Sequence, residues 1–353
     1  MTPAAVRAAF RRQSRACADM GSAQTARLLA GLADELTHGN PVADRILGWA
    51  GNPGPEGASV PLRLAGALHA LVLTGADGAL ARAYADAGQD PLPAALAAIE
   101  RHGETILRWL DNPPQTNEVG RSAVLIAAGH ALTQRFGLPL VLSELGASAG
   151  LNLIWDRYAL RAGVLRLGPV NPVLTLAPIW RGDLPPVARP RVAGRAAVDL
   201  RPLDPAADRI RLLAYVWADQ QDRLDRTRRA AEAAAAAGAR VDAGDAVDWL
   251  AGRLRQRHAG HLHLVFHTVV WQYLPAAAKA RGAELFALAG TIATPEAPLA
   301  RLAMEGDGDP GGARLTLELW PDGRQLDLGR CDFHGRWVDW RNPWPSTARA
   351  ANL

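Results

Sequence analysis

The first third of the chain carries apolar residues at helical spacing. From residue 2 to about residue 110, apolar positions recur three and four residues apart, as in 62–68, and no run alternates as a half-buried strand would. Residues 111–117 combine proline, asparagine and aspartate, which end helices and cap them. The pattern therefore predicts an all-α N-terminal domain at residues 1–115, followed by a helix over 118–136.

The period of the pattern changes after residue 139. Residues 140–145 form a short apolar run, which predicts a buried strand that leads into small residues and then another helix. A long helix is expected over about 205–237. Strand and helix patterns alternate along this part of the chain, which favours a parallel sheet. The further strands expected in that sheet are 195–200, 240–243 and 261–267.

The C-terminal pattern predicts antiparallel strands. Residues 298–304 are expected to form a strand, and two more runs, 315–320 and 324–330, flank the Pro-Asp-Gly turn at 321–323. Such a turn between two alternating runs is typical of a hairpin. The sheet should therefore end in a reversed pair.

These patterns together predict an α/β fold in which an all-α N-terminal domain precedes a Rossmann-like sheet with a C-terminal antiparallel hairpin. The second domain should span residues 116–353. A stretch rich in proline and glycine, at about 160–194, separates the first two predicted strands and is expected to be an insertion.

Composition limits the classes of function. The 353 residues are 49% hydrophobic and carry a formal net charge of +4, and Lys279 is the single lysine. Basic residues are not interleaved with aromatic ones, so we expect no nucleic-acid partner. Cys17 and Cys331 are too few for a disulfide framework or a zinc site, so we expect a reducing, cytoplasmic compartment and no metal. No apolar stretch reaches the roughly 18 residues of a membrane-spanning helix, so we expect a soluble protein.

Residues 144–150, Glu-Leu-Gly-Ala-Ser-Ala-Gly, carry the strongest chemical motif of the chain. They follow a predicted strand and precede a predicted helix, where backbone N–H groups can bind a polar ligand. Their spacing differs from the dinucleotide fingerprint. It resembles the E/D-x-G-x-G-x-G turn of class I S-adenosylmethionine-dependent methyltransferases, with Ser148 in place of the middle glycine. That resemblance implies S-adenosylmethionine as the cofactor.

The same residues also match the nucleophile elbow of serine hydrolases. Gly146-x-Ser148-x-Gly150 has the G-x-S-x-G spacing, and that elbow likewise joins a strand to a helix. A hydrolase would need an acid and a histidine, for which Asp245 with His267, or Asp309 with His334, are available. About 140 residues of helical pattern precede the motif, however, and no oxyanion loop is visible among them.

Two carboxylates follow the motif at the positions that a nucleotide cofactor would require. Asp199 ends the second predicted strand, where it can accept hydrogen bonds from a ribose diol. Asp245 follows the third strand and can accept from an adenine amino group, while the N–H of Ala246 donates to the ring. Both aspartates could equally cap the helices that follow them. Glu144 would contact the methionine ammonium, because a carboxylate on an apolar strand needs a polar partner.

His267, at the end of the fourth predicted strand, is the candidate for a catalytic base, and the alternative is a structural histidine. Ser148 could also simply cap a helix, and the glycines of the turn could serve only close packing. The predicted cofactor contacts are Glu144, Gly146, Ser148, Gly150, Asn152, Asp199, Asp245 and Ala246. The predicted pocket residues are Asn117, Glu118, Arg121, Thr268, Trp271, Gln272 and Tyr273.

Several runs together resemble the bacterial domain of unknown function 2332 family. They are residues 117–122, 144–153, 199–204, 216–220, 266–275 and 334–337. The resemblance covers essentially the whole chain, and it implies the methyltransferase-like Rossmann superfamily without implying an established reaction.

The expected function is therefore S-adenosylmethionine-dependent methyl transfer to an unknown acceptor, with a small molecule favoured. Two alternatives remain open, namely a non-catalytic protein that binds S-adenosylmethionine or a nucleoside, and a serine hydrolase that uses Ser148. The sequence predicts no particular oligomeric state.

Overall fold

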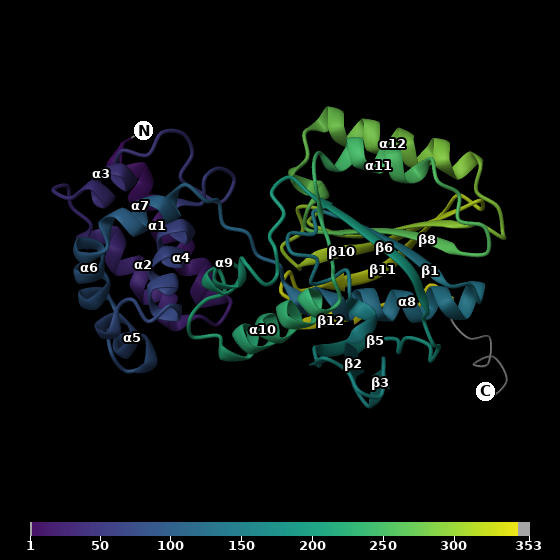
Figure 1. Cartoon of the computed structure of the whole chain (residues 1–353), viewed down its shortest axis with the longest axis horizontal. Coiled ribbons are helices and arrows are strands. Elements are labelled where there is room, and N and C mark those ends of the chain that lie inside the picture. Colours follow the sequence, from purple (N-terminus) through teal and green to yellow (C-terminus); the bar gives the residue numbers. More distant parts are fainter. Residues whose placement is uncertain (1, 345–353) are drawn as a thin grey trace. The chain divides into compact units, whose positions relative to one another are not determined.

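The computed structural model describes residues 2–344, which divide into two compact units (Figure 1). Unit 1 contains the residues up to Thr116 and the segment Asp208–Arg228, and unit 2 contains Asn117–Ala207 and the residues from Arg229 onward. The sequence pattern assigned 208–228 to the second domain, whereas in the structure this segment packs within unit 1. The chain is a mixed α/β protein with a helical N-terminal region and a large, mostly parallel sheet.

Unit 1 is built around α4 (Val60–Leu73), which is buried over most of its circumference. Side-chain caps start two of the surrounding helices, since Asn40 accepts from the Ala43 N–H and Asp77 accepts from those of Ala79 and Leu80. The other helices of this unit are α1 (Pro3–Asp19), α2 (Ala23–Glu35), α3 (Pro41–Leu47), α5 (Gly78–Ala85), α6 (Leu92–Arg101), α7 (Gly103–Leu110) and α9 (Arg209–Ala214).

The segment 208–228 enters the core of unit 1. Trp217 belongs to the same buried cluster as the α4 side chains. Tyr215 packs on Gly66, where a Cβ atom would lie 2.6 Å from the tyrosine Cε1. Asp219 accepts hydrogen bonds from the Ser22 hydroxyl and the Gln24 N–H. These residues separate α9 from α10 (Gln221–Ala236), so the long helix predicted over 205–237 is two helices.

Unit 2 is organised on a nine-stranded sheet with the order β5-β12-β11-β10-β9-β8-β1-β6-β7. The five strands from β9 to β7 run parallel, and β10 to β12 form antiparallel pairs. The bounds are β1 (Leu140–Leu145), β5 (Ile179–Gly182), β6 (Val192–Asp199), β7 (Asp242–Ala243), β8 (Leu262–Thr268), β9 (Leu299–Glu305), β10 (Ala313–Trp320), β11 (Arg324–Cys331) and β12 (Trp337–Trp340).

Helices cover both faces of this sheet. In Figure 1, α8 (Ser122–Phe136) lies on one face, and α11 (Ala246–Leu254) and α12 (Ala276–Thr291) lie on the other. Leu250 and Phe286, from the latter two helices, join a buried cluster with the strand residues Leu145, Val198 and Val265. A short 3-10 helix, η1 (Val119–Arg121), precedes α8.

The order of the strands reverses between β1 and β8. From β1 the chain continues to β6 and then β7 on one side, whereas β8 and β9 are added on the other side. The register pairs Glu144 with Phe266 and Leu145 with His267, so the two strands end together. Such a reversal leaves a crevice at the carboxyl ends of the strands, where ligands bind in open α/β sheets.

The helix predicted after β1 is absent, and this prediction was wrong. Residues 146–158 form successive turns and a 3-10 helix, η2 (Trp155–Arg157). The reason is the backbone conformation of the motif, because Gly146, Ser148 and Gly150 have φ values of 68°, 55° and 71°. Left-handed residues at every second position cannot continue into a right-handed helix.

The predicted insertion at 160–194 holds strands of its own. A separate three-stranded sheet has the order β3-β2-β4, with β2 (Ala159–Ala162), β3 (Leu165–Leu167) and β4 (Thr175–Leu176). Strand β5, from the same stretch, pairs with β12 at the edge of the main sheet. The hairpin predicted around 321–323 is present as β10 and β11, whereas β12 and β5 were not predicted.

No single helix within residues 2–344 has both the length and the apolar composition to cross a membrane. The pair α4 and α5, bent by 103°, meets both criteria only when taken together.

Candidate functional site

We call residues 144–150 the Glu144–Gly150 turn. It begins with the last two residues of β1 and lies at the crevice between β1 and β8. A Cβ atom on Gly146 would lie 2.6 Å from Val270 Cγ1, so the loop after β8 approaches too closely for any other residue. Ser148 also has a left-handed conformation, which is uncommon for a residue with a side chain and costs about 1–3 kcal/mol. Such strain is typical of functional turns.

Side chains from two other elements hold this turn in place. Asn117 Oδ1 accepts from the N–H groups of Ala149 and Leu151, at 3.2 and 3.0 Å. Asp199 Oδ2, at the end of β6, accepts from the Ser148 N–H at 2.9 Å. The structure therefore brings two predicted site residues, Asn117 and Asp199, directly onto the motif. Their visible contacts fix the shape of the turn.

Asn152 and Glu118 form a second layer beneath the turn. Asn152 Oδ1 accepts from the Ser122 hydroxyl at 2.7 Å, and its amide donates to the Glu118 carbonyl at 3.2 Å. The Glu118 carboxylate accepts from the Gly120 N–H at 2.9 Å. Asn152, Ser122 and Glu118 are all buried. This layer anchors the turn to the start of α8.

Glu144 is the exceptional residue of the site. Its side chain is 3% exposed, and its Oε2 atom is buried without a hydrogen-bond partner. Burial, reinforced by the Asp199 carboxylate, raises the pKa of Glu144 well above its usual value, and Arg121 opposes that shift. The Ser148 hydroxyl is likewise buried without a partner. An unsatisfied buried polar atom costs about 1–3 kcal/mol, so two beside one strained turn indicate a place for a polar ligand.

The end of β8 also carries backbone strain. Val269 has φ 58°, an outlier for a β-branched residue. The preceding carbonyl, of Thr268, accepts from Arg121 Nη1 at 2.9 Å, and Arg121 Nε donates to the Phe333 carbonyl at 2.9 Å. Burial lowers the pKa of Arg121, while Glu118 and Glu305 oppose the change. Adjacent ends of β1 and β8 thus each hold a left-handed non-glycine residue.

His267 is fully buried and its two ring nitrogens are both engaged. Nδ1 lies 2.7 Å from Glu305 Oε1, and Arg301 Nε donates to Nε2 at 3.2 Å. This pattern assigns the proton to Nδ1, because Nε2 accepts. Burial lowers the pKa of the ring, although Glu305 opposes the shift. His267, predicted as a base, therefore has no free nitrogen to accept a proton from a substrate.

Glu305, at the end of β9, organises the loop after β8. Its carboxylate accepts from the N–H groups of Val270, Trp271 and Gln272 at 3.0–3.1 Å. Bonding to His267 and to these amides keeps the pKa of Glu305 below its usual value despite burial. The sequence interpretation missed this residue, although a carboxylate that ends an apolar strand, as Glu144 does, was the available signal.

The predicted pocket residues of this loop have different environments. The Trp271 ring stacks on His267, with centroids 5.1 Å apart, and the Arg301 guanidinium lies 4.2 Å from the ring centre. Gln272 Oε1 accepts from the Gly306 N–H at 2.7 Å. Tyr273 is 70% exposed. Trp271 and Gln272 are therefore structural neighbours of Glu305, and Tyr273 is the one of these three that is largely open to solvent.

Asp245 has the geometry of a helix cap. Its Oδ1 accepts from the N–H groups of Val247 and Asp248 at 2.8 and 3.0 Å, at the start of α11, which begins with Ala246. The preceding strand, β7, contains only two residues. The capping alternative considered for Asp245 is thus present, and the second carboxylate oxygen remains outside the cap.

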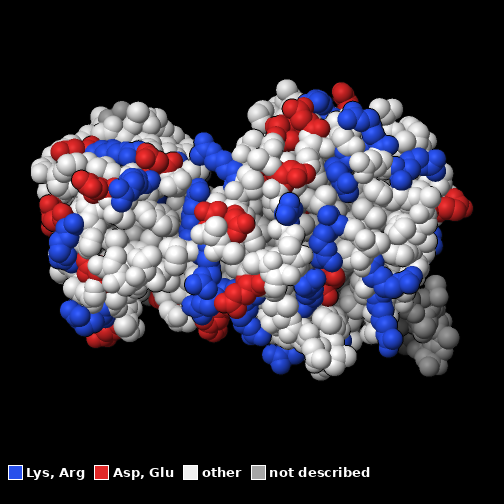
Figure 2. All heavy atoms as spheres, viewed as in Figure 1, with Lys and Arg blue, Asp and Glu red and all other residues white. Residues whose placement is uncertain are grey.

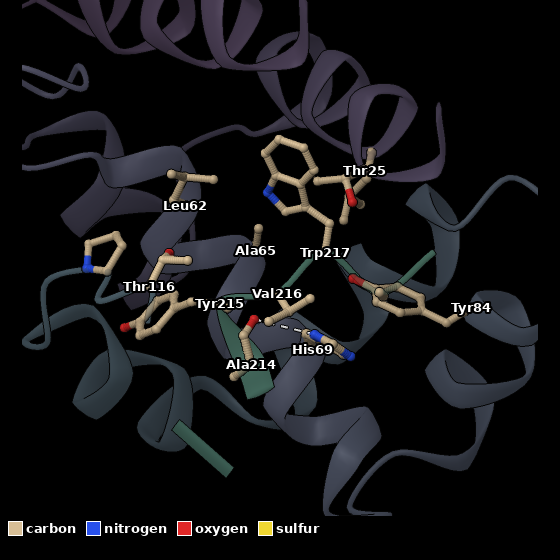
Figure 3. A pocket seen from close by; sticks show the side chains of 14 residues that line it. Thr25, Leu62, Ala65, His69, Tyr84, Thr116, Ala214, Tyr215, Val216 and Trp217 are labelled. Carbon is tan, nitrogen blue, oxygen red and sulfur yellow. Dashed lines mark hydrogen bonds between the residues drawn. The ribbon is translucent and has the colours of Figure 1, made fainter. Parts of the chain in front are cut away.

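Two cavities differ greatly in size. The smaller, about 30 Å³, lies in unit 1 between α4, α5 and residues 214–218, and Figure 3 shows His69 and Tyr84 on its wall. Its volume admits only one or two water molecules. The larger, about 510 Å³, lies in unit 2 between α8 and the inserted sheet. Within residues 2–344, no cluster of three or more His, Cys, Asp or Glu side chains could hold a metal ion.

Comparison with protein-family models shows the family to which the chain belongs. The model of the domain of unknown function 2332 family, described as an uncharacterized protein conserved in bacteria, matches residues 7–340. The chain belongs to this family. No curated protein and no solved structure matches the chain. In this member of the 2332 family, the match includes both units and every residue of the candidate site.

Proposed function

We propose that this chain is an S-adenosylmethionine-dependent methyltransferase that acts on a small molecule. Its site would lie at the carboxyl ends of β1, β6 and β8. The observation that carries the proposal is Glu144, a buried acid without a partner on its Oε2 atom, at the end of the strand where the sheet order reverses. A cationic or hydrogen-donating ligand group would satisfy it.

The residues present fit the parts of this cofactor. Glu144 and the Ser148 hydroxyl, both with unsatisfied buried oxygens, would hold the amino-acid part. Asp199 would contact the ribose, because its carboxylate ends β6 beside the Glu144–Gly150 turn, where it accepts from the Ser148 N–H. Asp245 would accept from adenine through the oxygen that does not cap α11, beside the Ala246 N–H.

The strand order supports the same class of site. The parallel strands β7-β6-β1-β8-β9 have the order third, second, first, fourth, fifth along the chain. That is the order of the doubly wound nucleotide-binding sheets, in which the ligand binds at the reversal. The Glu144–Gly150 turn follows β1, which borders the reversal, and Asp199 ends β6, the neighbour of β1 on its other side.

The bound cofactor would supply an electrophilic methyl group carried on a sulfonium. The protein's part would be to orient the acceptor and exclude water, because positioning two reactants can lower a bimolecular barrier by several kcal/mol, roughly 7–11. The exposed Tyr273 and the Thr268–Gln272 loop would contact the acceptor. His267 is a positioning residue in this scheme, because it holds Glu305 and Trp271 and thereby the loop.

Surface charge favours a small acceptor over nucleic acid. Figure 2 shows basic side chains interspersed with acidic ones over the face in view. Recognition of a phosphate backbone uses a basic patch or stripe, and 39 basic against 35 acidic residues give a small net positive charge for such a partner.

Calorimetric titration with S-adenosylmethionine and S-adenosylhomocysteine tests the proposal. We expect both to bind, and Glu144→Gln to weaken binding by roughly tenfold to a hundredfold, by loss of a charge-assisted contact. Because the raised pKa favours protonated Glu144, binding of the ammonium should release a proton, which makes the measured enthalpy depend on the buffer. Glu284→Gln, an exposed acid on α12, is the matched control. Absence of binding by both compounds would refute the proposal.

A non-catalytic binding protein is the second candidate, favoured by the engagement of both His267 nitrogens. Incubation of the protein and a small-molecule extract with methyl-labelled cofactor separates the two. Label incorporation that disappears in Glu144→Gln supports the enzyme, and cofactor binding without incorporation supports the binder.

A serine hydrolase would use Ser148, whose left-handed backbone is compatible with a nucleophile elbow. Its hydroxyl, however, has no hydrogen-bond partner, whereas a triad serine bonds to a histidine. Labelling of Ser148 by a fluorophosphonate, together with failure of S-adenosylmethionine to bind, would favour the hydrolase.

A further inference from the structure

The larger cavity of unit 2 lies apart from the Glu144–Gly150 turn. It has a volume of about 510 Å³, within the range of roughly 300–1,000 Å³ that small-molecule sites occupy. Its lining includes Ile126 and His130 of α8, residues of the inserted sheet and the loop that follows β3, and residues 187–190 before β6. His130 Nδ1 joins α8 to the residues before β6 by accepting from the Ala188 N–H at 3.1 Å. The cavity therefore lies between elements of unit 2 that are joined by a hydrogen bond.

The walls are mainly apolar. Ile126 and Leu167 are buried aliphatic side chains that line the cavity, and Trp155 is buried among them. Two valines of the lining are exposed to an unusual degree, Val170 at 86% and Val187 at 71%. Exposed apolar side chains at the edge of an apolar cavity lose their contact with water when a ligand enters, which favours an apolar occupant.

The charged residues of the lining determine which polar group a ligand of this cavity should carry. Asp156 is neutralised by a two-pronged ion pair with Arg195, at 3.0 and 3.1 Å. Arg166 donates only to the backbone carbonyls of Pro169 and Val170, and Arg189 makes no hydrogen bond or ion pair within residues 2–344. Two arginines without a carboxylate partner therefore lie on one apolar cavity, and a guanidinium can bind a carboxylate through two parallel hydrogen bonds.

We propose that this cavity binds an aliphatic monocarboxylate, with the chain between α8 and the inserted sheet and the carboxylate at Arg166 and Arg189. The proposal goes beyond the methyltransferase site and does not depend on it, because none of its residues belongs to the Glu144–Gly150 turn. We take the occupant to be aliphatic because the aliphatic side chains of the lining, Ile126, Leu167, Val170 and Val187, outnumber its aromatic ones, Trp155 and Tyr158.

Calorimetry or ligand-detected NMR with octanoate and 1-octanol on the full chain tests the charge requirement. We expect octanoate to bind saturably at one site and octanol, which has the same chain, to bind at least about fivefold more weakly. The double variant Arg166→Gln/Arg189→Gln should bring octanoate to the affinity of octanol. Arg324→Gln, an exposed arginine on the β10–β11 hairpin, should leave both affinities unchanged.

A second pair of variants locates the chain of the ligand. Val187→Trp fills the opening and should weaken octanoate and octanol alike, by about tenfold or more. Val164→Trp is the control, because Val164 is 98% exposed and does not line the cavity. Both positions are exposed, so the fold should tolerate them.

Four results would overturn the proposal. Octanoate could fail to saturate the wild-type chain, or could bind equally well to the double arginine variant or to Val187→Trp. Tighter binding of 1-naphthoate than of octanoate would assign the cavity to an aromatic acid and refute the aliphatic occupant. Failure of S-adenosylmethionine to bind would leave these titrations unaffected, so the two proposals fail independently.

Discussion

A buried histidine at the centre of the sheet should make unit 2 sensitive to mild acid. His263, on β8, is 5% exposed and lies 2.8 Å from the Ser143 hydroxyl on β1, which in turn accepts from Arg253 Nε at 3.2 Å. Burial, followed by the nearby His258 and Arg253, lowers the pKa of His263 from 6.5 to about 3. Protonation of the His263 ring would remove its capacity to accept the hydrogen bond from Ser143 and would add a positive charge beside Arg253.

The sign and the size of the effect follow from linkage. Above pH 6.5 the ring is neutral in the folded and the unfolded chain, so it costs nothing. As the pH falls from 6.5 towards 3, the unfolded chain takes up a proton that the folded chain does not, and stability is lost at about 1.36 kcal/mol per pH unit. Between pH 6.5 and 5.0 this one group should remove about 2 kcal/mol.

The double variant Ser143→Ala/His263→Leu isolates this contribution. Replacing both partners by apolar residues leaves no unsatisfied polar atom on either strand, although the half-buried Arg253 loses the Ser143 acceptor, so at pH 7.5 the unfolding free energy of the variant should lie within about 1–2 kcal/mol of wild type. Between pH 7.5 and 5.0 the stability of the variant relative to wild type should rise by about 2 kcal/mol. Other titrating groups occur in both proteins and cancel in the difference.

Urea unfolding monitored by circular dichroism at pH 7.5, 6.5, 5.5 and 5.0 measures that difference. Ser143→Ala is the control, because it removes the hydroxyl and keeps the titrating ring, so it should retain the pH dependence of wild type. A difference between wild type and the double variant that stays constant from pH 7.5 to 5.0 would show that His263 does not resist protonation in the folded chain.

Three further changes probe packing and the turn. Gly129→Ala places a Cβ atom 2.8 Å from Cζ3 of the fully buried Trp155, and should cost about 1–3 kcal/mol in thermal unfolding. Gly66→Ala should destabilise unit 1 by a similar amount through contact with Tyr215, and limited proteolysis should then cut segment 208–228 faster. Asn117→Ala removes an acceptor that binds two N–H groups of the Glu144–Gly150 turn and its neighbour Leu151. It should lower stability by about 1–3 kcal/mol and weaken S-adenosylmethionine binding in calorimetry. Unchanged values would exclude a role for Asn117 in shaping the turn.

The sheet could be predicted from the sequence where local pattern decides structure. The run at 140–145 is largely apolar and forms the fully buried β1, and the run predicted at 261–267, apolar residues with three histidines, corresponds to the fully buried β8. The Pro-Asp-Gly turn likewise sets the β10–β11 hairpin. The edge pair β5–β12 could not be predicted, because it joins residues more than 150 positions apart and neither strand has an apolar run long enough to be recognised.

The segment 208–228 could not be assigned to its unit from periodicity. Its helical pattern resembles that of the residues after it, and only tertiary contacts bring Trp217 and Tyr215 into the core of unit 1. The missing helix after β1 has another cause, since Ser148 is left-handed and the N–H groups of the turn donate to the side chains of distant residues, Asn117 and Asp199. A sequence pattern shows the spacing of apolar and polar residues, and it does not show contacts between residues far apart in the chain.

Two acids that the sequence presents alike have opposite environments in the fold. Glu144 and Glu305 each lie at the end of an apolar parallel strand, on either side of β8. Glu305 is held ionised, with lowered pKa, by His267 and the amides of the loop after β8, so its acceptor capacity already serves that loop. Glu144 has a raised pKa and an Oε2 atom without a partner. Of these two carboxyl groups, therefore, Glu144 is the one with a buried oxygen that the proposed ligand could satisfy, and Glu305 is the one that fixes the loop after β8.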